Sequence, residues 1–522
     1  MRTNNRTGKK LSIFSHLWLS IALCTSAIAM LTSACKNPQT LEHAIFKDSN
    51  SYFYTSLKEY PADKAPLPIG VFDSGTGGLA VLNDIVEYEC IDNDGLRVFE
   101  KESFIYLADM ANMPYGSYAM ENNTELLQEH IIKNVQFLID RKYYQSAGAI
   151  SYMADKSPVK AIVIACNTAT AYGQEMISDF LEKAGLDIIL IGVIDAATTG
   201  VVNSFAPDEN GSIAILATDG TVRSGAYVSS IEEKVKELHR HGDIRIFQQA
   251  GIGIAEAIDE NNDFISRSAL RPREGYMGPS EKGENELHIN LSIWERYLFQ
   301  MENGAMLYDG EPDNPRNLQI NSVDNYVAFH LVSLMEKIRT TENAQPLKSI
   351  VLGCTHYPYV AETFVKYLDS LRNYREDGEY IYRDYMAEHI SLINPAVKVA
   401  RQLHGLLEDR EILGNKSHRD SEFYIAVPNV LNNQVELRDD GSFTYEYKYG
   451  RVPGNIQEYV KRVPFSRDAI PDDILRRLEE QVPSVYEMMV WFNHTSPKTE
   501  YLPEQERIDN IRFESPVKLK LP

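Results

Sequence analysis

Short apolar runs alternate with stretches of helical periodicity along most of the chain, from about residue 67 onward. A short apolar run is typical of a buried strand, and apolar residues repeating at helical spacing indicate an amphipathic helix. Strands that alternate with helices predict parallel sheets covered by helices on both faces. We expect strands at 68–72, 103–107, 160–165, 187–194, 212–217 and 349–352, and helices at 79–89, 121–141 and 168–184. The expected fold class is therefore α/β.

Two segments depart from this alternation. Residues 262–322 are polar and rich in proline and glycine, which indicates an insertion on the scaffold. Near the C-terminus, residues 435–447 alternate around an Asp-Gly pair, which predicts a β-hairpin. Residues 472–492 look mainly helical, with an interruption at Pro483. We therefore expect an α+β C-terminal addition at 411–522.

The first 35 residues have the layout of a secretory signal. Basic residues precede an apolar run at 17–31, and small residues then lead to Cys35. This ending resembles a bacterial lipoprotein box, although Leu31 stands one position further upstream than usual. A lipid-modified Cys35 would make the chain an exported, membrane-anchored lipoprotein with a tether at 36–66. The alternatives are a plainly cleaved signal, an uncleaved anchor, and an unused signal that leaves the chain in the cytoplasm.

One long-range repeat indicates how the α/β part is divided. An apolar strand at 162–165 leads into Cys166, and a similar strand at 350–353 leads into Cys354. Ligands bind at the carboxyl ends of parallel strands. Two pseudo-symmetric α/β domains facing each other would therefore bring two thiols to opposite sides of one cleft. The expected segments are the signal at 1–35, the tether at 36–66, domain A at 67–198, domain B at 199–375 with the insertion at 262–322, a return to domain A at 376–410, and the C-terminal addition at 411–522.

Composition narrows the class of protein. Apolar residues make up 43% of the chain and charged residues 24%, as in an ordinary globular protein. The net charge of −22 argues against nucleic acid as the main partner, which requires a basic surface. Outside the signal, the cysteines are Cys90, Cys166 and Cys354, and their spacing matches no zinc site. Unpaired thiols in an exported chain suggest that they take part in a chemical reaction. The alternative is that they are buried structural cysteines.

Five sequence blocks resemble the signature blocks of glutamate racemases and occur in the family's order. They are VFDSGTGG at 71–78, YLADMANMPYGS at 106–117, ACNTA at 165–169, TDGTVRSGAY at 218–227 and LGCTHYP at 352–358. The similarity covers roughly residues 67–260 and 325–405. It implies a two-domain amino-acid racemase with its active site between the domains, and no pyridoxal phosphate, other cofactor or metal.

The family's functional residues carry over by position. Cys166 and Cys354 resemble the two thiols that transfer the proton, and Asp73 and His356 resemble the groups that help to poise them. Substrate contacts are implied for Asp73, Ser74, Tyr115, Gly116, Asn167, Thr168, Thr355 and His356, with Thr218 and Thr221 as further candidates for holding the α-carboxylate.

Two thiols suit the inversion of an α-carbon. One group must remove the α-proton from one face while another delivers a proton to the opposite face. Because the reaction runs in both directions, the two groups should be chemically alike. A thiol has a pKa of about 8.5, which a helix N-terminus or a polar neighbour can lower toward neutrality. Hydroxyls and N–H groups at helix starts, at Asn167, Thr168 and Thr355, could stabilise the developing negative charge.

Each motif also has an interpretation without catalysis. The glycine-rich run 75–78 matches neither common phosphate-loop pattern and, considered alone, is more often a tight turn. Asp73 could be a helix cap, His356 a capping or core histidine, and Tyr115 a simple turn residue. The combination of the motifs is what favours a racemase.

The resemblance implies interconversion of L- and D-glutamate, and a supply of D-glutamate for peptidoglycan. An exported enzyme cannot feed the cytoplasmic pool directly, so racemisation of aspartate or other amino acids outside the cytoplasm is an alternative. A non-catalytic amino-acid-binding lipoprotein and a one-thiol decarboxylase or isomerase are two more. The expected partners are glutamate and a membrane reached through Cys35, and whether the chain forms a homodimer is left open.

Overall fold

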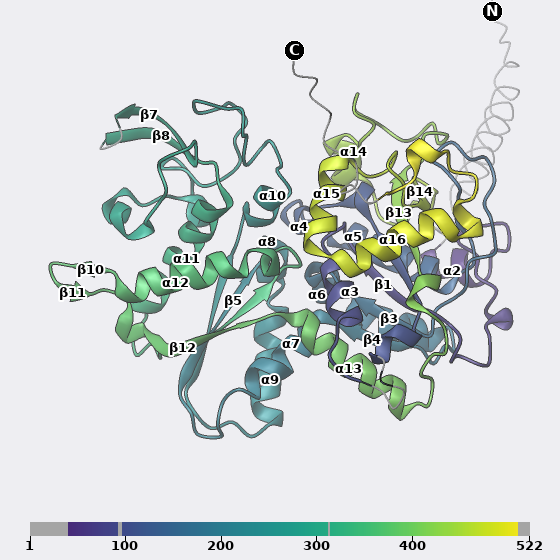
Figure 1. Cartoon of the computed structure of the whole chain (residues 1–522), viewed down its shortest axis with the longest axis horizontal. Coiled ribbons are helices and arrows are strands. Elements are labelled where there is room, and N and C mark those ends of the chain that lie inside the picture. Colours follow the sequence, from purple (N-terminus) through teal and green to yellow (C-terminus); the bar gives the residue numbers. More distant parts are fainter. Residues whose placement is uncertain (1–39, 92–94, 96, 312–313, 510–522) are drawn as a thin grey trace, which may run out of the picture.

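The computed structural model describes residues 40–91, 95, 97–311 and 314–509, and it has two α/β domains that lie side by side (Figure 1). The first domain is built on a six-stranded sheet in the order β14 (Val460–Pro464), β13 (Glu422–Pro428), β2 (Phe104–Ala108), β1 (Ile69–Asp73), β3 (Ala161–Ile164) and β4 (Ile189–Gly192). The second is built on a four-stranded sheet in the order β12 (Met386–Ile393), β9 (Leu347–Gly353), β5 (Gly211–Ala217) and β6 (Ile244–Ala250). Within these two sheets, all neighbouring strands are parallel except β13 and β14. The expected α/β fold class is confirmed.

Helices cover both faces of the first sheet. On one face lie α3 (Leu79–Val86), α13 (Pro395–Asp409), α15 (Asp472–Gln481) and α16 (Pro483–Thr495). On the other lie α2 (Leu41–Phe46), α5 (Thr124–Ile139) and α6 (Asn167–Lys183). The short helices α4 (Gly116–Met120) and α14 (Tyr445–Gly450) complete the domain. Every residue of β1 is buried, because this strand lies inside the sheet between two helical layers.

The second sheet is also covered on both faces. One face packs on α10 (Ile254–Ile258), α11 (Val323–Thr340) and α12 (Ala361–Asn373). The other packs on α7 (Val193–Val202) and α9 (Ala226–Glu237), with α8 (Asp219–Ser224) before it. Among the described residues, two further sheets each consist of one antiparallel pair of strands, β7 (Met306–Glu311) with β8 (Asn314–Ile320) and β10 (Arg375–Glu376) with β11 (Glu379–Tyr380). Among the described residues, no helix is both long enough and apolar enough to cross a membrane.

All six strands expected from the apolar runs are present, with ends that differ from the expected ones by no more than two residues. The sequence did not predict β6, β12, β13 and β14. β6 and β12 are the edge strands of their sheet and are only partly buried. They therefore include polar residues, such as Gln248 and Glu388, which interrupt the apolar run that marks a buried strand.

The prediction of a tether at 36–66 is wrong for the part that the structure describes. Thr40 caps α2 by accepting a hydrogen bond from the backbone N–H of His43 at 3.2 Å. Ile45 and Phe53 are buried in the core of the first domain. These few apolar side chains hold the segment on the domain, although they are too sparse to produce a recognisable period. The predicted signal, including Cys35, lies outside the described residues.

The predicted return to the first domain at residue 376 is also wrong. Residues 386–393 form β12, which pairs with β9 in the second sheet. The chain therefore enters the first domain again only at α13. Asn394 caps this helix by accepting from the N–H of Ala396 at 3.0 Å, and Pro395 follows as its first residue.

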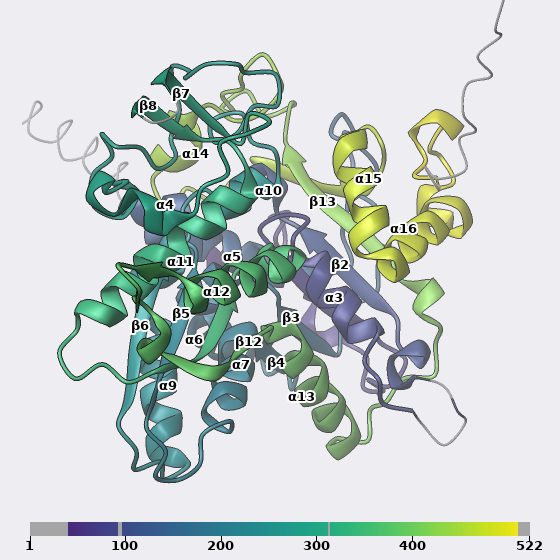
Figure 2. The ribbon, with the colours of Figure 1, turned by 60° about the vertical axis from the view of Figure 1, so that its left-hand side comes forward.

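The C-terminal residues up to 509 form an α+β region that builds directly onto the first sheet. β13 lies between β2 and β14, and α15 and α16 (yellow) lie beside it (Figure 2). The hairpin predicted at 435–447 is wrong, since Leu437 and Phe443 form only an isolated bridge. The reason is local: the Thr444 hydroxyl accepts from the N–H of Tyr447 at 3.2 Å and starts α14 where a second strand would begin.

We expect the C-terminal region to be part of the folding unit of the first domain. Phe423 on β13 is fully buried and contacts the rings of Tyr106 and Phe465. Phe423→Ala should therefore lower the free energy of unfolding by about 3–5 kcal/mol, as measured by urea denaturation. Leu431→Ala, at a side chain 55% exposed in the same region, should change it by about 0.5 kcal/mol or less. Equal effects of the two substitutions would contradict this integration.

Candidate active site between the two domains

A cavity of about 320 Å³ lies between the two domains, at the carboxyl ends of strands from both sheets. All ten residues predicted to be catalytic or to contact substrate line it: Asp73, Ser74, Tyr115, Gly116, Cys166, Asn167, Thr168, Cys354, Thr355 and His356. Thr218 lines it too, whereas Thr221 is buried next to Thr218. The structure thus brings the predicted residues together, and their individual roles stay predictions.

The glycine-rich run after β1 forms a tight turn around Asp73. The N–H groups of Gly75 and Gly78 donate to Asp73 Oδ2 at 3.3 and 2.8 Å. A Cβ atom on Gly77 would lie 2.5 Å from Thr355 Oγ1, so glycine lets this turn pack against the second domain. Burial raises the pKa of Asp73, and the N–H groups and His356 only partly offset this effect. These two N–H groups donate to a carboxylate of the protein itself, as expected if the glycine-rich run 75–78 is a tight turn.

Cys166 is the N-cap residue of α6. Its sulfur accepts from the N–H of Ala169 at 3.4 Å and lies 3.8 Å from the hydroxyl of Ser74. The side chain is buried, and burial, with the charge of Asp73 adding to it, raises the pKa of the thiol. A helix N-terminus can lower the pKa of a thiol, but desolvation outweighs this effect at Cys166. The raised pKa favours the protonated thiol, which is the form that can donate a proton.

Cys354 has a charged neighbour. Its sulfur lies 3.7 Å from His356 Nδ1, and His356 Nε2 lies 3.0 Å from Asp259 Oδ2. Burial opposes a charge on His356, but the Asp259 carboxylate and the Cys354 sulfur together outweigh it, so the pKa of His356 is raised well above its usual value. An imidazolium next to a thiol stabilises the thiolate. The two thiols therefore have different polar neighbours: His356 lies beside Cys354, and Ser74 and Asp73 lie beside Cys166.

Sequence reasoning missed Asp259 and Arg477. Asp259 follows α10 in the second domain, and Arg477 lies on α15 in the first, with 2.5 Å between Arg477 Nη1 and Asp259 Oδ1. Burial alone would raise the pKa of Asp259, but His356 and Arg477 lower it to about 2. Both residues lie outside the five resembling blocks. Local sequence gave no signal for either, since their pairing depends on how the domains pack.

Three threonine hydroxyls meet at the contact between the domains. Thr168 Oγ1 lies 3.1 Å from Thr218 Oγ1 and 3.3 Å from Thr221 Oγ1, and the latter two are 2.9 Å apart. Thr168 belongs to the first turn of α6, and Thr218 is the N-cap of α8. Hydroxyls at helix starts are suited to binding a carboxylate.

Two other predicted contacts are held by the protein itself. The Tyr115 hydroxyl donates to Asp109 Oδ2 at 2.5 Å and accepts from Asn134 Nδ2 at 2.8 Å, so the phenol is fixed in a buried network. The Tyr227 hydroxyl donates to Asn167 Oδ1 at 2.6 Å, which orients the amide group of Asn167. Both contacts keep polar side chains of the cavity wall in one position.

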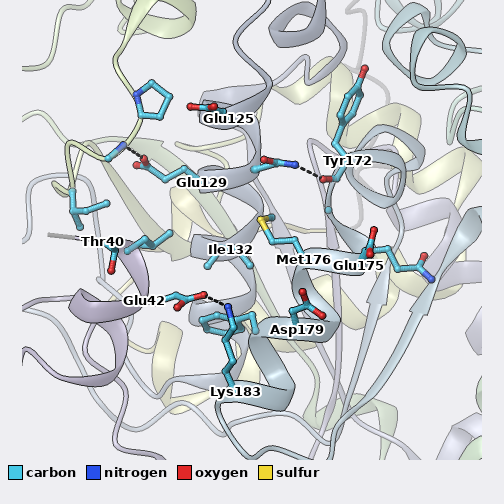
Figure 3. Close-up of a pocket in the computed structure, with 18 of the residues that line it drawn as sticks. Thr40, Glu42, Glu125, Glu129, Ile132, Tyr172, Glu175, Met176, Asp179 and Lys183 are labelled. Carbon is cyan, nitrogen blue, oxygen red and sulfur yellow. Dashed lines mark hydrogen bonds and ion pairs between the residues drawn. The ribbon is translucent and has the colours of Figure 1, made fainter. Parts of the chain in front are cut away.

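A larger hollow, of about 860 Å³, lies elsewhere on the first domain, between α2, α5 and α6 (Figure 3). Several carboxylates line it, among them Glu125, Glu175 and Asp179, together with Lys183, whose ammonium pairs with Glu42 at 2.8 Å. It contains no cysteine and none of the ten predicted residues. The described residues also contain no group of three or more His, Cys, Asp or Glu that could hold a metal ion. The cavity between the domains, in contrast, is lined by both Cys166 and Cys354.

Comparison with known proteins gives a consistent set of relatives, although no family model matches the chain. The glutamate racemase of Pseudomonas paraeruginosa is 31% identical over 371 residues, which are 71% of this chain and 93% of the relative. The glutamate racemase of Oceanobacillus iheyensis is 25% identical over 345 residues, which are 66% of this chain and 81% of the relative.

Solved structures of glutamate racemases also match. One from Bacillus anthracis is 20% identical, with a TM-score of 0.41, over 69% of this chain and 87% of its own. One from Francisella tularensis, in complex with D-glutamate, is 19% identical, with a TM-score of 0.37, over 74% of this chain and 95% of its own. Because these TM-scores are below 0.5, the assignment rests on sequence. With 31% identity over almost the whole of one relative, the chain belongs to the glutamate racemase family and is an amino-acid racemase.

Proposed function

We propose that this enzyme interconverts L- and D-glutamate by proton transfer between two thiols, without a cofactor. The observation that carries the proposal is the pair Cys166 and Cys354, which follow parallel strands of two different domains and line one cavity. The names of the relatives support glutamate as the substrate. The cavity volume of about 320 Å³ is in the range of small-molecule sites.

The surroundings of the thiols suggest how a turnover begins. Cys354, next to the His356 imidazolium, removes the α-proton as a thiolate, and protonated Cys166 delivers its proton to the opposite face. In the reverse direction, the two thiols exchange these roles. After each turnover the proton is therefore on the other thiol, and the cycle returns to its start through the reverse reaction or by exchange with solvent.

The carbanion formed on the way needs electrostatic stabilisation. Its charge spreads into the α-carboxylate, which we assign to the hydroxyls of Thr168 and Thr218 and to the start of α6. Asn167 and Thr355 supply further polar contacts from the two sides of the cavity. These groups are fixed before substrate arrives, so they need not reorganise when the charge develops.

We also propose that D-glutamate from this reaction is used for peptidoglycan, and that the chain is exported and anchored through a lipid on Cys35. The basic, apolar and small-residue pattern of residues 1–35 supports the anchor. An anchored enzyme would act on glutamate outside the cytoplasm, next to the wall, so its product reaches cytoplasmic precursor synthesis only if it is taken up.

Either thiol substitution should abolish racemisation. Cys166→Ala and Cys354→Ala should each lower kcat/KM for glutamate by about 10³-fold or more, since each thiol acts in every turnover. Circular dichroism of L- and of D-glutamate measures the rate. Cys90→Ala is the matched control, because Cys90 lies outside the cavity, and it should keep the wild-type rate. Near-wild-type turnover in Cys166→Ala or Cys354→Ala would refute the two-thiol mechanism.

Location and activity can be separated in a bacterium that requires D-glutamate for growth. A chain without residues 1–35 should stay in the cytoplasm and restore growth. The complete chain should instead fractionate with the membrane and carry a fatty acid on Cys35, and Cys35→Ser should not. An unmodified Cys35 in mass spectra of the mature protein would exclude the anchor. Failure of the shortened, folded chain to restore growth would argue against glutamate racemisation.

A further inference from the structure

The C-terminal helix α15 reaches the catalytic cavity. Leu475 and Leu478 are buried in the core of the first domain and fix the helix there. Ile474, on the same helix, lines the cavity directly. Arg477 follows Ile474 at a spacing of three residues, which places both on one side of the helix. In Figure 1, α15 lies next to α10 of the second domain.

Arg477 crosses from the first domain to the second. Its Nη1 atom donates to the backbone carbonyl of Ile258 at 3.0 Å and lies 2.5 Å from Asp259 Oδ1. The guanidinium and the carboxylate are both mostly buried, with side-chain exposures of 17% and 21%. A buried charge pair of this kind is costly to break from one side, because the remaining charge is left without its partner.

The two oxygens of Asp259 have different partners. Oδ1 faces Arg477, and Oδ2 lies 3.0 Å from His356 Nε2. With one oxygen held by a guanidinium that is itself held by a backbone carbonyl, the carboxylate has little freedom to rotate. The imidazole is fixed through Asp259, and its other nitrogen lies 3.7 Å from the sulfur of Cys354.

We propose that Arg477 is a positioning residue for Cys354: it holds Asp259, and through Asp259 the His356 ring, against that thiol. The proposal rests on the two-thiol function proposed above. It gives the C-terminal region a role in the chemistry, since this region supplies the outermost member of a chain of contacts that ends at one thiol. No such chain of contacts reaches Cys166 among the described residues, where the polar neighbours are Ser74, Asp73 and the start of α6.

Because this chain of contacts reaches Cys354 and not Cys166, the proposal can be tested by measuring proton removal by each thiol separately. In a glutamate analogue with chloride on the β-carbon, a thiolate removes the α-proton, and the electrons of the broken C–H bond form a C=C bond as chloride leaves. The resulting enamine tautomerises to an imine, which water hydrolyses to a keto acid and ammonia. Each enantiomer of the analogue needs only the thiol on its own face, and Cys354→Ala identifies the enantiomer that depends on Cys354.

Arg477→Met should lower kcat/KM for elimination from the Cys354-dependent enantiomer by about 10- to 100-fold, mainly in kcat, because the base is misplaced. Elimination from the other enantiomer should fall by less than about threefold. Arg477→Lys should recover part of the loss, since it keeps the charge but not the planar group. Arg476→Met, at the exposed neighbouring position, should behave as wild type.

The possible outcomes test the positioning role of Arg477 separately from the two-thiol function. Equal losses for both enantiomers, or an Arg477→Met enzyme as active as Arg476→Met, would overturn the positioning role while leaving the two-thiol function intact. A wild-type enzyme that neither racemises glutamate nor eliminates chloride would overturn the proposed function itself. Near-ultraviolet circular dichroism checks that each variant is folded, and if Arg477→Met is not, the same asymmetry must be found in Arg477→Lys.

Discussion

Each thiol depends for its position on a buried parallel strand that ends just before it, β3 two residues before Cys166 and β9 one residue before Cys354. β3 is held by hydrogen bonds to β1 and β4, and β9 to β5 and β12. Both strands are hydrogen-bonded to neighbours on both edges. Neither strand can therefore shift along its axis, and carry its thiol with it, without breaking these hydrogen bonds. The distance across the cavity therefore depends on how the two domains pack. A Cβ on Gly220 would lie 2.9 Å from Gly116 Cα, so this packing brings backbone close to backbone.

The two halves of the site have similar strands but different electrostatics. Burial and the charge of Asp73 raise the pKa of Cys166, whereas Cys354 lies 3.7 Å from His356, whose own pKa is raised well above its usual value. On the proposed mechanism, the two protonation states of the free enzyme therefore differ in energy. The substrate equilibrium is symmetric for two mirror-image amino acids, so this difference can affect only how the free enzyme is distributed between its two forms, and not the final ratio of products.

The sequence predicted best where function is encoded locally. Four of the five blocks contain all ten predicted residues, which line the cavity, because each of these blocks lies at or directly after the end of a strand. The sequence did not predict the features that depend on tertiary contacts. Asp259 and Arg477 lie far apart in the chain and in no recognisable motif, and their pairing exists only once the domains are packed. The tether was misjudged because a few buried side chains, such as Ile45, suffice to fix a segment, and the hairpin because Thr444 caps a helix.

The position of β13 also determines when the first domain can be complete. The N–H of Phe104, at the start of β2, donates to the hydroxyl of Ser421, which is 317 residues further along. During synthesis from the ribosome, β2 therefore stays an open edge strand until residues 422–428 have emerged. An open edge of this kind invites pairing with other chains. The nascent protein is therefore exposed to aggregation until its own C-terminal strand covers β2, unless a chaperone covers this edge until then.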